Sequence, residues 1–306
     1  MMTSISKKYW HFILSQGFLS GASIGLLMFP AMAAVPQWFD KKRGAAMGAA
    51  VAGSSLGGVI FPIVLSNLLE KTDVGFGWSV RIVGFMMVPF LAVTMLTVRS
   101  RLPRRNTRFF LPESFKNKMY VLLIIATFFC MVGMFVPLFL IPSYAITQGM
   151  DTDLANNLVA ILNSASFFGR VIPGILGDKL GRINTLIAAG TTTGIITFCW
   201  PKAESNAAII VIAIFIGFSS GAIASCAGVA FSLCPEDPRN IGTYMGVGMA
   251  VAAGSALLGP PVSGVLLDKY GGFHEVSWFA GAMTLFGALI TAAAKSQSKQ
   301  GLFGTT

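Results

Sequence analysis

An arginine lies deep inside an apolar stretch of the chain. Residues 166–183 read SFFGRVIPGILGDKLGRI, and Arg170 interrupts the apolar part of this segment. Near the centre of a membrane helix an arginine costs about 2.5–3.5 kcal/mol, so it usually faces a bundle interior or an aqueous cavity. A guanidinium binds a carboxylate through two parallel hydrogen bonds. Arg170 is therefore a candidate for binding an anionic substrate. The alternative is a structural arginine that donates to backbone carbonyls or to a neighbouring side chain.

Three polar side chains precede Arg170 at helical spacing. Asn156, Asn163 and Ser166 lie 14, 7 and 4 residues before it. An α-helix brings positions at such intervals to one face. We therefore expect a substrate-binding set made of Arg170, Asn163, Ser166 and Asn156.

A charged hairpin follows this set. Gly177-Asp178-Lys179-Leu180-Gly181-Arg182 lies between two apolar segments. Its glycines permit a tight turn, and Asp178 can cap a helix or pair with a cation across the turn. Taken alone, the segment indicates a turn that ends both helices.

The elements that carry these residues are membrane-spanning helices. Of the 306 residues, 54% are hydrophobic and 11% are charged, whereas soluble domains carry about 25% charged residues. No segment shows the period-two alternation of a membrane β-barrel. We expect an all-α, polytopic protein that sits in a lipid bilayer. Nine segments are long enough to cross it: 12–38, 45–69, 77–98, 119–147, 154–177, 183–201, 206–234, 240–267 and 276–294.

The net charge of +10 is distributed unevenly over the connecting loops. Lys and Arg concentrate in loops on one side, above all in residues 99–118. By the positive-inside rule, this segment and the C-terminus are cytoplasmic. The basic excess therefore sets orientation, and it does not indicate nucleic-acid binding.

The sequence lacks the residue patterns of metal binding, nucleotide binding and acid–base catalysis. The four cysteines and two histidines show no metal-ligand spacing. No phosphate-binding loop and no paired carboxylates inside a predicted span occur in the sequence. We expect no cofactor, no metal and no enzymatic activity.

An internal repeat organises the predicted spans. Residues 17–22 (GFLSGA) match 217–222 (GFSSGA), and residues 53–56 (GSSL) match 254–257 (GSAL), at an offset of about 200 residues. Six spans separate the copies, so the repeat is parallel, as in transporters built from two six-helix halves. We expect residues 1–98 to be a three-helix remnant of an N-terminal half. We further expect 99–118 to be a basic linker, 119–296 a six-helix half and 297–306 a tail.

Residues 174–182 also resemble a family signature. GILGDKLGR is similar to the short cytoplasmic motif of the major facilitator superfamily, Gly-x-Leu-x-Asp-Arg-x-Gly-Arg, with lysine in place of the first arginine. In that family the motif governs conformational change and does not touch substrate. The resemblance assigns this gating role to Gly174, Gly177, Asp178, Lys179, Gly181 and Arg182.

The first two spans narrow the resemblance. Residues 38–48 (WFDKKRGAAMG) and 52–58 (AGSSLGG) resemble the fungal monocarboxylate-permease branch of the superfamily. The nine spans then correspond to the family's fourth to twelfth helices. Animal monocarboxylate carriers pair the arginine with an aspartate one turn earlier, where this chain has Ser166, so coupling to a proton stays open.

The resemblance implies a secondary active transporter of a small organic anion, such as a monocarboxylate, by alternating access. The alternatives are a non-transporting, truncated relative and an exporter of a fungal secondary metabolite. The plasma membrane is the expected location. The sequence does not give the oligomeric state.

Overall fold

The computed structural model describes residues 1–39, 41–101 and 111–297. That part of the chain is helical, without a β-strand. A π-helical stretch, Ile13–Leu19, joins α1 to α2, so that Tyr9–Trp38 forms one span. The helices are α1 (Tyr9–Phe12), α2 (Ser20–Trp38), α3 (Arg43–Glu70), α4 (Gly75–Thr97), α5 (Lys118–Thr147), α6 (Thr152–Leu180), α7 (Arg182–Cys199), α8 (Asn206–Phe231), α9 (Ile241–Tyr270) and α10 (Phe273–Ser296).

Nine helical segments among the described residues are long and apolar enough to cross a membrane. This number confirms the predicted all-α, polytopic architecture. Three of the helices, α5, α6 and α8, begin at a polar residue whose side chain accepts a capping hydrogen bond. Asp151, for example, accepts a hydrogen bond from the Asp153 N–H at 3.1 Å and starts α6.

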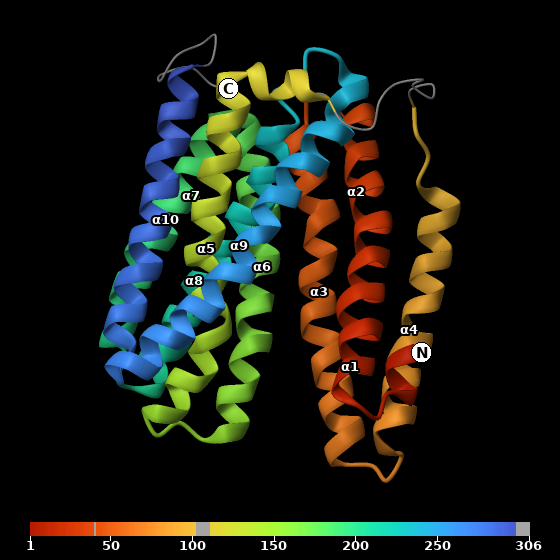
Figure 1. Ribbon diagram of the computed structural model, residues 1–306, viewed down its shortest axis with the longest axis vertical. Helices are drawn as coiled ribbons and strands as arrows, with labels where there is room; N and C mark the ends of the chain where they lie inside the picture. The colour runs from red at the N-terminus through yellow and green to blue at the C-terminus, as the bar shows by residue number, and fades with distance from the viewer. Residues whose placement is uncertain (40, 102–110, 298–306) are drawn as a thin grey trace.

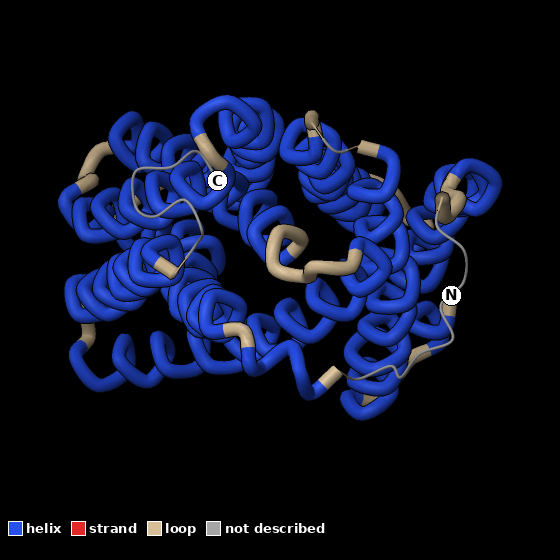
Figure 2. The backbone as a smooth tube through the Cα atoms, turned by 90° about the horizontal axis from the view of Figure 1, so that it is seen from above, coloured by secondary structure: helices blue, strands red, loops and turns tan. Residues whose placement is uncertain are grey.

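The helices form two groups that stand side by side (Figure 1) and are seen nearly end-on in Figure 2. One group holds α2, α3 and α4, and the other holds α5 to α10. The predicted division at residues 1–98 and 119–296 stays a prediction. Residues 102–110 of the predicted linker and 298–306 of the predicted tail lie outside the described residues.

Helix α6 forms the edge of the second group that faces α3, and glycines let it approach both α3 and α8 closely. A Cβ at Gly48 of α3 would collide with the Arg170 carbonyl, and one at Gly217 of α8 with the Leu162 carbonyl. Small residues of this kind let membrane helices pack backbone to backbone. The helix that carries Arg170 therefore touches α3 on one flank and α8 on the other.

The two groups meet at one end of the bundle, which is uppermost in Figure 1. The start of α3, the end of α8 and the turn between α6 and α7 lie together there, and we call this the closed end. All six buried residues of α3 fall between Gly44 and Ser55, and none falls within 56–70. The buried residues of α3 therefore all lie in its first half, toward the closed end.

Candidate functional site

Arg170 reaches from α6 to α3 at the boundary between the two groups. Its Nη1 donates to the Val51 carbonyl at 3.0 Å and also to the Ser54 hydroxyl. The Ser54 hydroxyl in turn donates to the same Val51 carbonyl at 2.9 Å. The Arg170 Nε is buried and has no partner among the described residues. The guanidinium thus bonds to neutral groups of α3, and no carboxylate contacts it in this part of the chain.

Glycines in α3 bring the two backbones close enough for this contact. Gly44 and Gly174 face each other, because a Cβ at Gly44 would lie 2.5 Å from the Gly174 carbonyl oxygen. Farther along the helices, a Cβ at Gly58 would lie 2.7 Å from the Asn163 Oδ1. The two antiparallel helices are therefore in register from Gly44 to Gly58, and Arg170 lies midway along this seam.

The other predicted substrate-binding residues do not all face α3. Asn163 does, and its amide Nδ2 donates to the Val159 carbonyl of its own helix at 2.9 Å. Ser166 is 4% exposed and packs instead on Gly221 of α8. Asn156 is exposed near the start of α6. The structure therefore brings Asn163 and Arg170 to the seam with α3 and places Ser166 against α8, a difference from the expected shared face.

Asp178 caps the N-terminus of α3. Its carboxylate accepts hydrogen bonds from the Gly44 N–H at 2.8 Å and the Ala45 N–H at 2.9 Å, and it pairs with the Arg182 Nε at 3.1 Å. A carboxylate at this position also interacts favourably with the helix dipole. Asp178 therefore joins the second group of helices to the first at the closed end.

The remaining residues of the predicted gating segment shape the turn. Gly181 has a φ of 99°, a conformation that other residues adopt only with strain. Gly177 packs on Thr185, and Gly174 on Gly44. Lys179 is exposed to the surroundings of the bundle. These contacts place Gly174 and Asp178, but not Lys179, in the interface with α3.

Three methionines converge at the closed end on Gly228 of α8. Met32, Met47 and Met245 place their Cε atoms 3.3, 3.4 and 3.6 Å from the point where a Cβ at Gly228 would lie. They come from α2, α3 and α9, and each is at most 6% exposed. Met47-Gly48 and Met245-Gly246 also match each other at the offset of the internal repeat. This methionine cluster, defined by Met32, Met47, Met245 and Gly228, closes the end of the bundle with apolar side chains.

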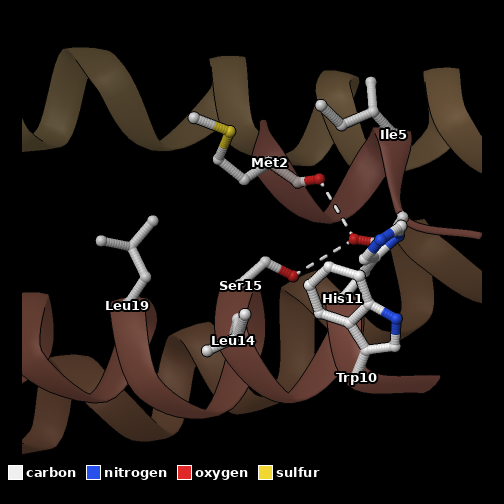
Figure 3. A pocket seen from close by; sticks show the side chains of 8 residues that line it. Met2, Ile5, Trp10, His11, Leu14, Ser15 and Leu19 are labelled. Carbon is white, nitrogen blue, oxygen red and sulfur yellow. Dashed lines mark hydrogen bonds between the residues drawn. The ribbon is translucent and has the colours of Figure 1, made fainter. Parts of the chain in front are cut away.

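A separate pocket of about 330 Å³ lies near the N-terminus. The Ser6 hydroxyl lies 3.3 Å from the Met2 carbonyl and 3.3 Å from the Ser15 hydroxyl. Figure 3 shows Met2 and Ser15 among the residues that line the pocket. The pocket contains none of the predicted site residues. Its lining is Met2, Ile5, Ser6, Trp10, His11, Leu14, Ser15 and Leu19.

Within residues 1–39, 41–101 and 111–297, no group of three or more His, Cys, Asp or Glu side chains lies close enough together to hold a metal ion. Cys130, Cys226 and Cys234 are buried free thiols, and Cys199 is exposed.

Sequence reasoning did not find the partners of Arg170. Ser54 and Val51 were outside the predicted set, as was Arg43, whose Nη1 donates to the Ser232 carbonyl at 3.2 Å. The Gly44-x-x-x-Gly48 spacing was a usable signal for a close helix contact. A backbone carbonyl such as that of Val51 leaves no trace in residue type.

Two groups of membrane helices that meet at one end, with a buried cation in the seam between them, define a polytopic membrane protein. The sequence model described as Major Facilitator Superfamily matches residues 1–246 and 165–301. The chain belongs to this superfamily. Two solved structures share the fold: the E. coli fucose:proton symporter FucP (TM-score 0.74, 16% identity, 95% of this chain and 78% of that one) and the human organic anion transporter MFSD10 (TM-score 0.73, 14% identity, 95% and 73%).

Several fungal proteins are more similar in sequence. The aspyridones efflux protein apdF of Emericella nidulans is 46% identical over 98% of this chain and 62% of its own length. The agnestins efflux protein AgnL12 of Paecilomyces divaricatus is 37% identical over 98% and 69%. The chain thus spans about two thirds of the length of these relatives. They are transporters and not enzymes, and the monocarboxylate specificity implied by the resemblance stays a prediction.

Proposed function

We propose that the protein is a secondary transporter that exports a small organic anion across the plasma membrane by alternating access. The observation that carries this proposal is Arg170. Its guanidinium lies between the two groups of helices, bonds only to neutral atoms of α3 among the described residues, and leaves Nε buried without a partner. A buried cation without a counter-ion favours the binding of an anion.

The direction of transport rests on the relatives. Two of them are named as efflux proteins for fungal metabolites. The separation of the groups away from the closed end supports a cavity that opens to the side opposite the basic loops. Asn163, next to Arg170 along the seam, and Asn156, near the start of α6, are proposed to contact the polar part of the molecule. Ser166 offers a hydroxyl only if α6 moves away from α8.

Gating is proposed for the predicted segment of residues 174–182. The cap that Asp178 forms on α3 has to break before the closed end separates, and Gly174 and Gly44 then part. Arg182 stays with Asp178, since the two belong to one turn. No proton-coupled step runs through Ser166, because a hydroxyl does not replace an aspartate as a proton carrier near pH 7.

The test uses benzoate as the probe and benzamide as its neutral counterpart. In yeast cells that express the chain and are loaded with labelled benzoate, Arg170→Ala is expected to abolish the added efflux. Arg170→Lys is expected to weaken it, since an ammonium lacks the planar fork. Arg239→Ala, at the exposed turn before α9, is the matched control. Efflux by Arg170→Ala equal to wild type, at equal surface expression, would reject the proposal.

A second candidate is a membrane protein that binds the anion without moving it. The uncovered surface of α2 to α4 favours this reading, because in the most apolar 18 residues of α4 no residue is buried. The two candidates differ in one result. Benzoate raises the Tm of the purified chain in both, through Arg170, but only a transporter shows benzoate efflux.

A further inference from the structure

The contact between Arg170 and α3 leaves most of the guanidinium's hydrogen-bonding capacity unused. Nη1 bonds to the Val51 carbonyl and the Ser54 hydroxyl, while the buried Nε has no partner in the described part of the chain. A guanidinium has five N–H donors, and an anion accepts two of them side by side. The closed arrangement therefore satisfies Arg170 less completely than an anion would.

The closed seam also excludes a ligand from this position. At Gly48 the backbone of α3 lies so close to the Arg170 carbonyl that a single methyl group would not fit. The contacts of Arg170 with Val51 and Ser54 are made within the next two turns of the same seam. A carboxylate that binds the guanidinium from the side of α3 thus needs α3 to withdraw. Anion binding there and closure compete for the same donors.

We propose that Arg170 is a latch between the two groups of helices: its guanidinium holds α3 through the Val51 carbonyl and the Ser54 hydroxyl, and the anionic group of the transported molecule releases α3 by taking these donors. The inference rests on the proposed function, in which Arg170 meets an anion, and it adds that anion binding itself loosens the closed end. Ser54 becomes a residue that sets both the stability of closure and the affinity for the anion.

Cys234 provides a measurement of closure. It follows α8 at the closed end, is 7% exposed and packs in the same core cluster as Met32 and Met47. Burial raises the pKa of its thiol to about 12, so little thiolate is present at neutral pH. Alkylation of Cys234 by N-ethylmaleimide is expected to be slow while the end is closed and faster when it opens. The exposed Cys199 serves as an internal reference in the same peptide mass spectrum.

The first arm of the experiment uses membranes that contain the full chain and no added anion. Ser54→Ala removes one of the two acceptors of Arg170, and loss of one such bond corresponds to an about two- to tenfold change in an equilibrium. Cys234 alkylation is expected to rise by about this factor. Ser55→Ala is the matched control, because the neighbouring Ser55 hydroxyl is buried and makes no hydrogen bond in the described structure. Equal rates for the two variants would overturn the latch.

The second arm adds benzoate or benzamide. Benzoate is expected to accelerate Cys234 alkylation in the wild type, to do so at lower concentration in Ser54→Ala, and to have no effect in Arg170→Met. Benzamide is expected to have no effect in any of them. A benzoate effect that is absent, or that slows alkylation in the wild type, would overturn release by the anion.

The outcomes also separate this inference from the proposed function. Arg170-dependent benzoate efflux, combined with equal alkylation in Ser54→Ala and Ser55→Ala, would overturn the latch and leave the transporter standing. Benzoate-induced exposure of Cys234 without efflux would support the latch and exclude transport.

Discussion

Asp178 joins the two groups of helices at the closed end. Its two oxygens accept from the Gly44 and Ala45 N–H groups, and Oδ1 also accepts a hydrogen bond from the Arg182 Nε. Capping bonds of this kind contribute about 0.5–2 kcal/mol. Because these bonds cross between the two groups of helices, their free energy stabilises closure as well as α3.

We predict that Asp178→Asn loosens the closed end. The amide keeps one acceptor but loses the charge that favours the helix N-terminus and Arg182. Cys234 alkylation is expected to rise about threefold or more, and the Tm of the purified chain to fall. Lys179→Gln, at the exposed neighbouring position, is expected to change neither. Equal alkylation rates in the two variants would contradict the gating role of Asp178.

At the scale of the helix, α6 is held through backbone contacts on two flanks. Gly48 lies against it from α3, and Gly217 and Gly221 lie against it from α8. Close packing without side chains leaves little freedom for one helix to slide along the other. A rigid α6 carries Arg170 and Asp178 together, so events at these two residues reach α3 through the same element.

Gly48→Ala is predicted to force α3 away from α6. The added methyl group meets the Arg170 carbonyl, which is backbone and cannot turn aside. Overpacking of this kind costs about 1–3 kcal/mol, so a lower Tm and faster Cys234 alkylation are expected. Gly53→Ala on the same helix is the control, because a Cβ there meets no atom within 4 Å. There, alanine is expected to leave the Tm unchanged or to raise it, since it favours the helix.

The elements were easier to predict from the sequence than the contacts between them. Long apolar runs predict the number of spans. Inside a bilayer no water bonds to the backbone, and an α-helix satisfies its own N–H and C=O groups. Periodicity placed Asn163 and Arg170 on one face but did not separate Ser166 from them. Ser166 lies about 60° around the helix from Asn163 and about 40° from Arg170, and it meets α8. The partner helix of each face depends on the packing of glycines from distant segments, and a helical period contains no information about it.

For the whole molecule, the two groups of helices differ in how well they are covered. In the most apolar 18 residues of α5, 61% are buried, compared with 11% in the first span and none in α4. In the second group α5 packs on α10, where Gly287 meets the Cys130 N–H. In the repeat, α2, α3 and α4 are the counterparts of α8, α9 and α10. The exposed faces of α2 to α4 therefore correspond to the faces of α8 to α10 that α5, α6 and α7 cover.

We predict that three apolar helices fused before Met1, taken from the corresponding region of a longer relative, protect the first group. Amide hydrogen exchange in α4 is expected to slow at least about tenfold, while exchange in α10 stays the same and serves as the internal reference. A fusion of three unrelated membrane helices is the control. If α4 in the chain alone already exchanges as slowly as α10, the prediction is wrong.

The glycines of α2 have an evolutionary consequence. Gly221 of α8 meets α6, but at its counterpart Gly21 a Cβ would meet no atom within 4 Å, and the same holds for Gly25. Each glycine inside a helix lowers its stability by about 1 kcal/mol relative to alanine. In a lineage whose protein folds without a helix on this face, selection has no reason to retain them, and alanine is expected to replace both positions among natural variants. Retention of both glycines in such variants would record that a helix is still selected to lie there.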